Sequence, residues 1–578
     1  MKRLAFTIAA GLLFGSVFAH AQVAPSTRPL TVPPAQAIHA RNGMVVAQES
    51  RAARIGVTIL DRGGNAVDAA VAVGFAMAVT YPRAGNIGGG GFMVIHLAKD
   101  NKDLAIDYRE TAPAAATPTM FLDAQGNPDP AKSRDSALSI GVPGTVAGLA
   151  LAHRKYGSGK LSLADLMQPA IDLAEKGFPV QDDLADSLPN VIKRLARWPS
   201  SATIFLNGDR PLREGDRLLQ FDLADTLKTV ARKGPDGFYQ GDVAARIAAA
   251  VQKAGGIMTK DDLAAYRPVE RAVVRGSYRG YDIVSMPPPS SGGVHLIEML
   301  NILEGYDLAK LPREQALHYE IEAMKRAYAD RAEFMGDPDA ISMPVAGLVS
   351  KSYAANLRAA ISERATPSAE IRAGKPADFE GRNTTHYSVI DRDGNAVSNT
   401  YTLNFSYGSG LVADGTGVLL NNELDDFTAK PGASNAYGLV GFNANLPGPG
   451  KRPLSSMTPT IVLKDGKPVL VTGSPGGSRI ISAVLQVIVN VLDFHMDVAA
   501  AVSAPRLHHQ WQPDQVFAER DVLPALLDAL AARGHTIVPT DPHTSANSIA
   551  VIPKAEFTPQ TYIGAADTRT RGALAAGY

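Results

Sequence analysis

A change of pattern near residue 384 constrains the fold of this 578-residue chain more than any other feature. The segment 363–383 is polar, contains Pro and Gly, and keeps no sustained apolar period. Two runs of alternating, strand-like sequence follow at 385–390 and 396–402, and the Asp-Gly pair at 393–394 lies between them. Such runs around an Asp-Gly turn predict a β-hairpin. We therefore expect a polar connecting segment that leads directly into a buried hairpin.

Helical patterns dominate the chain before this junction. They predict helices at 66–78, 142–155, 161–177, 220–232, 242–254, 292–303 and 315–334. Strands are expected at 43–48 and, after the hairpin, at 410–420 and 459–472, followed by a helix over 480–492. Helices first and a strand-rich part second, with strands in both, predict an α+β fold with four αββα layers.

The first 21 residues predict export. Lys2 and Arg3 precede an apolar run over 4–18, and an Ala-His-Ala triplet ends at Ala21. This is the pattern of a secretory signal peptide that is removed after Ala21. A membrane anchor is the alternative, but the run of about 15 residues is shorter than the roughly 20 that a spanning helix needs. We expect a soluble, exported protein, in the periplasm rather than fully extracellular.

Charge and cysteine content exclude several functions. Lys plus Arg equals Asp plus Glu at 57 each, so there is no basic surplus for binding nucleic acid. The absence of cysteine excludes disulfides, a thiolate nucleophile and thiolate metal sites. There is no H-E-x-x-H metal motif, and Leu161 follows the Gly-Ser-Gly-Lys run where a P-loop requires Ser or Thr. We expect no metal and no organic cofactor.

A glycine run and a histidine pair are both interpreted as structural features. The run Gly88–Gly91 leads into an apolar strand at 92–95 rather than into a helix, so it does not match a phosphate-binding loop. A tight turn or a close approach of two backbones is expected there. His508 and His509 form a pair without further ligands at helical spacing, so a structural role is expected for them as well.

Six further motifs stand in a fixed order along the chain. They are Asp107–Pro113 (DYRETAP), Asn383–Val389 (NTTHYSV), Tyr401–Asn404 (YTLN), Leu419–Phe427 (LLNNELDDF), Arg452–Pro459 (RPLSSMTP) and Gly473–Ser478 (GSPGGS). Together they resemble the γ-glutamyltranspeptidase family of the N-terminal nucleophile hydrolases, from about residue 38 to the C-terminus. The resemblance implies a precursor that cuts itself between Asn383 and Thr384. Its large subunit, 22–383, and small subunit, 384–578, would form one intertwined αββα unit.

Thr384 is the nucleophile that the resemblance implies. A threonine hydroxyl needs a base, and cleavage would leave Thr384 with a free α-amine, whose reference pKa of about 7.7–8.0 suits that task. By the family's pattern, the Thr402 hydroxyl orients the nucleophile, and the backbone N–H groups of Gly476 and Gly477 form the oxyanion hole. Without the family, these residues would be ordinary strand threonines and a tight turn.

The remaining motif residues match the two ends of a γ-glutamyl group. The resemblance implies that Arg109, Ser455 and Ser456 hold the α-carboxylate. It also implies that the α-ammonium is accepted by Asn404, Glu423 and Asp426. Taken singly, Arg109 could be a surface ion pair, the serines a helix cap and the acidic residues a solvated face. Taken jointly, their charges suit both ends of one substrate.

Residues 431–442 match the family's lid loop, with Tyr437 as the gating residue; a lid would exclude water from the acyl-enzyme. The implied reaction transfers the γ-glutamyl group of glutathione and related compounds, through an ester on Thr384, to water or to amino acids and peptides. Two rival functions remain open at this point. One is an acylase for glutaryl or cephalosporin side chains, and the other is a non-enzymatic exported binding protein of the same fold.

Overall fold

The computed structural model describes residues 32–374, 386–542, 544–555 and 558–578. The predicted signal peptide and the predicted cleavage site, Asn383 and Thr384, lie outside these residues. Within the described ranges, no helix has both the length and the apolar character of a membrane span.

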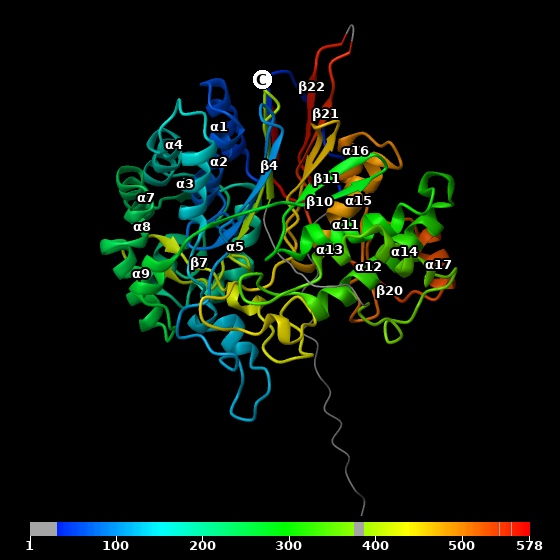
Figure 1. Cartoon of the computed structure of the whole chain (residues 1–578). Coiled ribbons are helices and arrows are strands. Elements are labelled where there is room, and N and C mark those ends of the chain that lie inside the picture. Colours follow the sequence, from blue (N-terminus) through cyan, green and yellow to red (C-terminus); the bar gives the residue numbers. More distant parts are fainter. Residues whose placement is uncertain (1–31, 375–385, 543, 556–557) are drawn as a thin grey trace, which may run out of the picture.

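Two seven-stranded sheets form the centre of the molecule (Figure 1). The first sheet has the order β23-β2-β12-β13-β3-β4-β9, and all neighbours are antiparallel. Its strands are β2 (Gly43–Ala47), β3 (Gly90–Leu97), β4 (Lys102–Asp107), β9 (Val269–Arg271), β12 (His386–Asp391), β13 (Ala396–Thr402) and β23 (Leu574–Gly577). The predicted hairpin is confirmed as β12 and β13, which occupy the middle of this sheet.

The second sheet has the order β1-β22-β21-β17-β16-β11-β10 and is also antiparallel throughout. Its strands are β1 (Ile38–Ala40), β10 (Val274–Tyr278), β11 (Tyr281–Ser285), β16 (Thr460–Lys464), β17 (Lys467–Thr472), β21 (Ser548–Ile552) and β22 (Thr561–Ala565). Each sheet therefore combines strands from before residue 375 with strands from after residue 385.

The facing sides of the two sheets share one apolar core. Val46 and Phe92 of the first sheet pack in the same cluster as Ile461 and Val471 of the second, and all four are fully buried. Because side chains alternate between the faces of a strand, the opposite faces must be covered by other elements.

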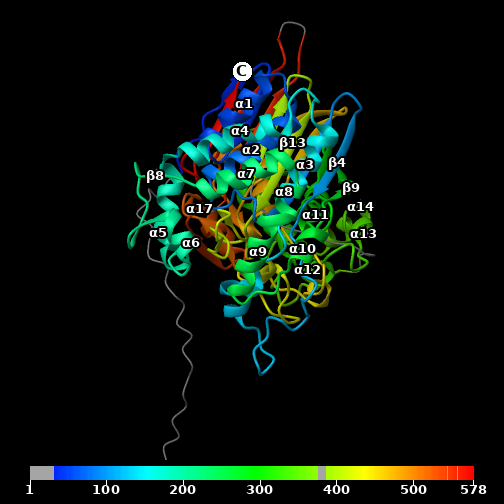
Figure 2. The same ribbon diagram turned by 90° about the vertical axis from the view of Figure 1, so that its left-hand side faces the viewer.

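Helices provide that cover on both sides (Figures 1 and 2). On the first sheet lie α1 (Ser50–Asp61), α2 (Ala66–Thr80) and α3 (Thr145–Tyr156). Further out on the same side, and in the same apolar core, lie α4 (Leu163–Lys176), α7 (Phe221–Lys233) and α9 (Gly241–Lys253). On the second sheet lie α11 (Ser291–Leu303) and α16 (Val498–Ser503), and α12 (Arg313–Phe334) and α15 (Ile480–Leu492) pack against α11 in the same apolar core. The predicted four-layer αββα class is confirmed.

Smaller elements complete the chain. The helices are α5 (Asp182–Leu195), α6 (Pro199–Phe205), α8 (Asp236–Tyr239), α10 (Lys260–Ala265), α13 (Val345–Leu348), α14 (Lys351–Ala359) and α17 (Pro524–Ala532). The strands are β5 (Phe178–Pro179), β6 (Leu206–Asn207), β7 (Arg210–Pro211), β8 (Arg217–Leu218), β14 (Val412–Ala413), β15 (Val418–Leu419), β18 (Leu507–His508), β19 (Val516–Glu519) and β20 (Ile537–Thr540). The strands predicted over 410–420 are thus only two residues long, because Gly415 and Gly417 take positive φ angles of 67° and 65° that interrupt the extended chain.

The glycine run that precedes β3 fixes the end of β13. A side-chain carbon at Gly88 would lie 2.1 Å from the carbonyl oxygen of Leu419, and one at Gly89 would lie 2.1 Å from that of Thr402. Only glycine leaves room for these two carbonyl groups. The predicted close backbone approach is confirmed, and it holds Thr402 against the loop that enters β3.

Candidate active site

A cavity of 860 Å³ lies where β13 ends. Six of the predicted site residues line it: Thr402, Asn404, Glu423, Tyr437, Gly476 and Gly477. These residues come from segments that are far apart in the sequence, so the fold brings the predicted motifs together. The other predicted residues in the described part of the chain are buried: Arg109, Asp426, Ser455 and Ser456. Arg109 donates to Glu423 of this wall, to Asp426 and to the carbonyl oxygen of Pro453, which shortly precedes the two serines.

Arg109 follows β4 and lies fully buried in an ion cluster. Its Nη1 donates to Glu423 Oε1 at 2.5 Å, and its Nη2 donates to Asp426 Oδ2 at 2.7 Å. Its Nε donates to the carbonyl oxygen of Pro453 at 3.2 Å, next to the serine pair. The guanidinium therefore contacts two of the groups predicted to accept the substrate ammonium. A surface ion pair is excluded for Arg109, because neither side of the pair reaches solvent.

Burial also excludes a surface role for the acidic residues. Glu423 and Asp426 are 0% and 2% exposed, so they do not form a solvated acidic face. Ser455 and Ser456 lie outside the helices, in a loop that joins Ser290 through a β-bridge, so a helix cap is excluded as well. Within the described residues, the buried hydroxyl of Ser456 has no hydrogen-bond partner. Such an unsatisfied buried hydroxyl is costly unless a ligand completes it.

The cluster holds more carboxyl groups than cations. A third carboxylate, Glu110, lies 3.9 Å from Arg109 Nη1. Burial raises the pKa of Glu110 to about 7, and it raises the pKa of Glu423 well above its usual value, although Arg109 opposes both shifts. Burial lowers the pKa of Arg109, but Glu423, Glu110 and Asp426 raise it by more. Burial therefore favours the neutral form of these carboxyl groups, and a further cation beside them would let them ionise and pair with it.

Asn404 joins the strand end to the loop over the cavity. Its backbone N–H donates to Thr402 Oγ1 at 2.8 Å, and its φ of 73° lies in the left-handed region that is uncommon for residues other than glycine. Its Nδ2 donates to the carbonyl oxygen of Asn422 at 2.9 Å. These contacts fix the amide, so its Oδ1 points to Tyr437.

Tyr437 crosses the cavity within the segment 431–442. Its hydroxyl lies 2.8 Å from Asn404 Oδ1 and 2.9 Å from the Asn404 carbonyl oxygen, to which it donates. Its ring packs edge-on against Phe405, and a side-chain carbon at Gly477 would lie 2.5 Å from the Tyr437 ring. The tyrosine thus bridges Asn404 and Gly477.

Gly476 and Gly477 form a further part of the cavity wall. Their φ angles are 131° and 57°, which disfavour any other residue. A side-chain carbon at Gly476 would collide with Thr544 at 2.3 Å. The pair opens a short helical turn, Gly477–Arg479, that continues into α15. Backbone N–H groups at the start of a helix carry partial positive charge, which suits an oxyanion.

Comparison with known proteins decides the family. A family model described as gamma-glutamyltranspeptidase matches residues 52–577. The chain belongs to the γ-glutamyltranspeptidase family. It is 51% identical to the glutathione hydrolase proenzyme of Escherichia coli (strain K12), with 98% of each chain covered. It is also 40% identical to the acylase ACY 1 proenzyme of Pseudomonas sp. (strain SE83), with 86% of this chain and 87% of the relative covered.

A solved structure supports the same assignment. The crystal structure of a cephalosporin acylase from Bacillus halodurans matches with a TM-score of 0.83 and 28% identity, covering 97% of this chain and 99% of that one. The family thus includes relatives named both as glutathione hydrolases and as acylases, so the chemistry of the individual site must separate these activities.

Sequence reasoning missed several residues of this γ-glutamyltranspeptidase site. Glu110 stands in the DYRETAP motif next to Arg109. Its position beside a predicted ligand-binding arginine is the sequence signal that could have indicated it. Arg194 of α5 and Arg479 also line the cavity. Arg479 follows the GSPGGS motif directly, whereas nothing in the sequence around Arg194 indicates its position, which depends on how α5 packs.

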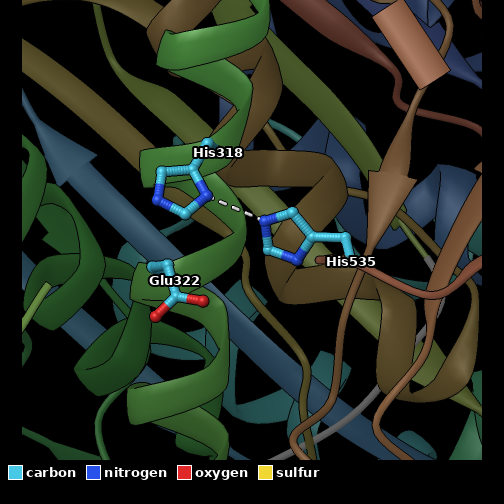
Figure 3. A group of neighbouring side chains, drawn as sticks. All are labelled: His318, Glu322 and His535. Carbon is cyan, nitrogen blue, oxygen red and sulfur yellow. Dashed lines mark hydrogen bonds between the residues drawn. The ribbon is translucent and has the colours of Figure 1, made fainter. Parts of the chain in front are cut away.

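One cluster that does not line the cavity has the composition of a metal site (Figure 3). His318, Glu322 and His535 each offer one ligand atom, and these three atoms lie within 4.8 Å of one another. The Nδ1 of His318 and the Nε2 of His535 share a 2.8 Å hydrogen bond. Glu322 already pairs with Arg326 at 2.7 Å and Lys325 at 3.3 Å. The two cations balance the carboxylate, which disfavours a divalent ion here.

The His508–His509 pair also has protein partners. His508 lies 2.9 Å from Ser482 Oγ, and His509 lies 3.2 Å from Asp514. Both rings are buried, and burial lowers their pKa values. The contacts agree with the structural role that was predicted for this pair.

Proposed function

We propose that the chain is a glutathione hydrolase and γ-glutamyltransferase that matures by cutting itself between Asn383 and Thr384. The observation that carries this proposal is the buried cluster of Arg109, Glu423 and Asp426 beside the cavity. It offers a guanidinium and an excess of carboxyl groups within one site, as a bound zwitterion requires. The 51% identity to a glutathione hydrolase proenzyme supports the same conclusion.

Maturation begins with the Thr384 hydroxyl. Its oxygen attacks the Asn383 carbonyl carbon, the peptide C–N bond breaks as the nitrogen takes a proton, and water hydrolyses the resulting ester. The products are subunits 22–383 and 384–578, the second with a free amine on Thr384. The proposal is supported by the described strand β12, which begins two residues after Thr384 and pairs with β13, whose last residue, Thr402, lines the cavity.

Catalysis then uses the same hydroxyl. The α-amine of Thr384 takes the hydroxyl proton while the oxygen attacks the γ-carbonyl carbon of the donor. The N–H groups of Gly476 and Gly477 stabilise the oxyanion, and the amine returns the proton to the leaving nitrogen. Thr402 holds the hydroxyl in position. The γ-glutamyl ester is released by water or by an amino acid or peptide amine.

Substrate binding completes the buried cluster. The donor's α-carboxylate binds Arg109 and the hydroxyls of Ser455 and Ser456, and its α-ammonium binds Glu423 and Asp426, with Asn404 as a further acceptor. Each charge-assisted hydrogen bond contributes about 1.5–3 kcal/mol. The unpartnered hydroxyl of Ser456, within the described residues, supports this assignment.

An acylase for glutaryl side chains is the second candidate, favoured by the 40% identity to an acylase proenzyme. A glutaryl group has the terminal carboxylate but no ammonium. It would bring no cation to the surplus carboxyl groups around Arg109, which would stay largely protonated, whereas an ammonium would let them ionise and pair with it. The charge of the cluster therefore favours γ-glutamyl donors. A glutaryl donor with a higher kcat/KM than its γ-glutamyl counterpart would reverse the choice.

The proposal includes export to the periplasm through residues 1–21, with no membrane anchor in the mature protein. The acceptors are water, amino acids and small peptides. Closure of the segment 431–442 by Tyr437 excludes water and so favours transfer over hydrolysis.

A denaturing gel tests the proposal together with an activity assay. The wild-type enzyme should give two bands and cleave glutathione. Thr384→Ala should give one band near the full-length mass and no activity. The matched control is Thr58→Ala, an exposed threonine of α1, which should behave as the wild type. An uncut wild-type chain that still cleaves glutathione would exclude the mechanism.

A further inference from the structure

The cavity wall carries more positive charge than the γ-glutamyl group needs. In the described part of the chain, four arginines line the cavity. Two of them have carboxylate partners: Arg83 pairs with Asp183 at 2.6 Å, and Arg569 pairs with Glu519 at 2.6 Å. The other two, Arg194 and Arg479, have no carboxylate within ion-pair distance among the described residues. Their charge is therefore available to a ligand.

Arg194 extends from α5 to the cavity. Its guanidinium carbon lies 5.2 Å from the centre of the Phe405 ring, and its Nη1 donates to the carbonyl oxygens of Ser406 at 3.1 Å and Gly408 at 3.3 Å. Burial lowers the pKa of Arg194, while the more distant Asp135 offsets this in part. The cation is thus partly desolvated and only neutral oxygens compensate it directly.

Arg479 has the same kind of surroundings. It ends the short turn that starts at Gly477, and its guanidinium carbon lies 4.9 Å from the centre of the Phe517 ring. Its Nη1 donates to Thr540 Oγ1 at 3.2 Å. Burial lowers the pKa of Arg479 as well. An aromatic ring against the face of a guanidinium leaves its edge donors directed outward, in the geometry that binds a carboxylate.

We propose that Arg194 and Arg479 form a carboxylate-binding subsite for the part of the substrate beyond the γ-glutamyl bond. Its ligand is the terminal carboxylate of an amino acid or short peptide, either in the leaving half of the donor or in the acceptor. This inference rests on the proposed function and extends it. The cavity then has two ends of opposite character: the carboxyl-rich cluster near Glu423 binds the γ-glutamyl ammonium, and the arginines bind the other end of the peptide.

One subsite serves both ligands because the second half-reaction is the reverse of the first, with the acceptor amine in place of the leaving amine. In the first, the γ-amide C–N bond breaks, the Thr384 oxygen forms the ester bond, and the leaving amine takes a proton. In the second, an acceptor amine loses a proton and forms a new C–N bond as the ester bond breaks. The attacking amine follows the path of the leaving amine, so its carboxylate meets the same two arginines.

The donor experiment compares glutathione, whose leaving dipeptide ends in a carboxylate, with γ-glutamyl-p-nitroanilide, whose leaving group has none. Arg194→Met and Arg479→Met should each lower the ratio of kcat/KM for glutathione to that for the anilide by about 10-fold or more. Arg194→Lys and Arg479→Lys keep the charge and should recover part of that loss. Arg246→Met, at an exposed arginine of α9, is the matched control and should leave the ratio unchanged.

The acceptor experiment needs only the wild-type enzyme at first, so it does not depend on the folding of a variant. With the anilide as donor, glycylglycine should be a better acceptor than glycylglycinamide, and both methionine variants should lose this preference. Equal use of the two acceptors by an active wild-type enzyme, with an unchanged donor ratio in the variants, would overturn the subsite alone. A correctly folded wild-type protein that is inactive on both donors would overturn the proposed function and the subsite with it.

Discussion

Arg109 and Arg479 belong to the same site but have opposite surroundings. Arg109 is fully buried and contacts Glu423 and Asp426, with Glu110 nearby. Arg479 lies half-buried on the cavity wall, rests against Phe517 and meets no carboxylate within the described residues. The first arginine is part of the interior charge balance, whereas the second has no carboxylate within ion-pair distance in the described part of the chain, and the more distant Glu519, which pairs with Arg569, offsets its desolvation in part.

This difference separates two effects that a substitution can have. Removing a partner from a buried ion cluster leaves other charges uncompensated, which costs stability even without substrate. Removing a cation that has no carboxylate partner costs less stability and mainly changes what the cavity binds. Stability and substrate preference should therefore respond independently at the two positions.

The largest effect is expected for Arg109→Met. Three carboxyl groups would lose their cation, so the free energy of unfolding should fall by about 3–5 kcal/mol, with loss of activity. Arg479→Met should cost less than about 1 kcal/mol. Urea denaturation in the uncleaved Thr384→Ala background measures both, because there the chain is one piece. Equal losses at the two positions would contradict the comparison.

A smaller effect is expected for Glu110→Gln. The pKa of Glu110 is raised to about 7 by burial, so the folded chain holds a proton that the unfolded chain releases near pH 4.5. The stabilisation that protonated Glu110 contributes is fully present below about pH 4.5, and it is lost as the pH rises towards about 7. The free energy of unfolding of the wild type should therefore decline between about pH 5 and 8, and Glu110→Gln should remove about 2 kcal/mol of this decline. Urea denaturation in the uncleaved background measures both proteins. Glu370→Gln, at an exposed site, should keep the wild-type decline.

The smallest effect is expected for Tyr437→Phe. The variant loses the hydroxyl that donates to Asn404, a hydrogen bond of about 0.5–1.5 kcal/mol. The lid should open more often, and the ratio of hydrolysis to transfer should rise by about 2- to 10-fold, as product analysis with glycylglycine would measure. Tyr156→Phe, whose hydroxyl donates to Glu270 away from the cavity, is the control. An unchanged ratio would show that this tyrosine does not gate water.

Much of the fold was predictable because its elements follow local rules. The helix 480–492 was predicted with the bounds that the structure has, and the hairpin around Asp393 and Gly394 follows from its turn chemistry. The two-residue strands β14 and β15 could not be anticipated. Their ends depend on the backbone angles of Gly415 and Gly417, which an alternating pattern does not reveal.

The site residues that belong to sequence motifs were predictable. Arg109, Glu423 and Asp426 meet as their motifs implied, although their direct pairing with one another was not foreseen. The roles of Thr384 and its neighbours stay predictions. Arg194 could not be found from the sequence, because a surface-like arginine on a helix becomes part of a site only through tertiary packing.

The mixed strand order of both sheets has a consequence for the cut chain. In the first sheet β12 and β13 lie between β2 and β3, and in the second β16 lies beside β11. Neither half of the sequence contains a complete sheet, so neither could acquire its shape alone. A cut before β12 would create two new chain ends without releasing either piece. Translation as a single polypeptide would also supply the two pieces in equal number, already threaded through one another.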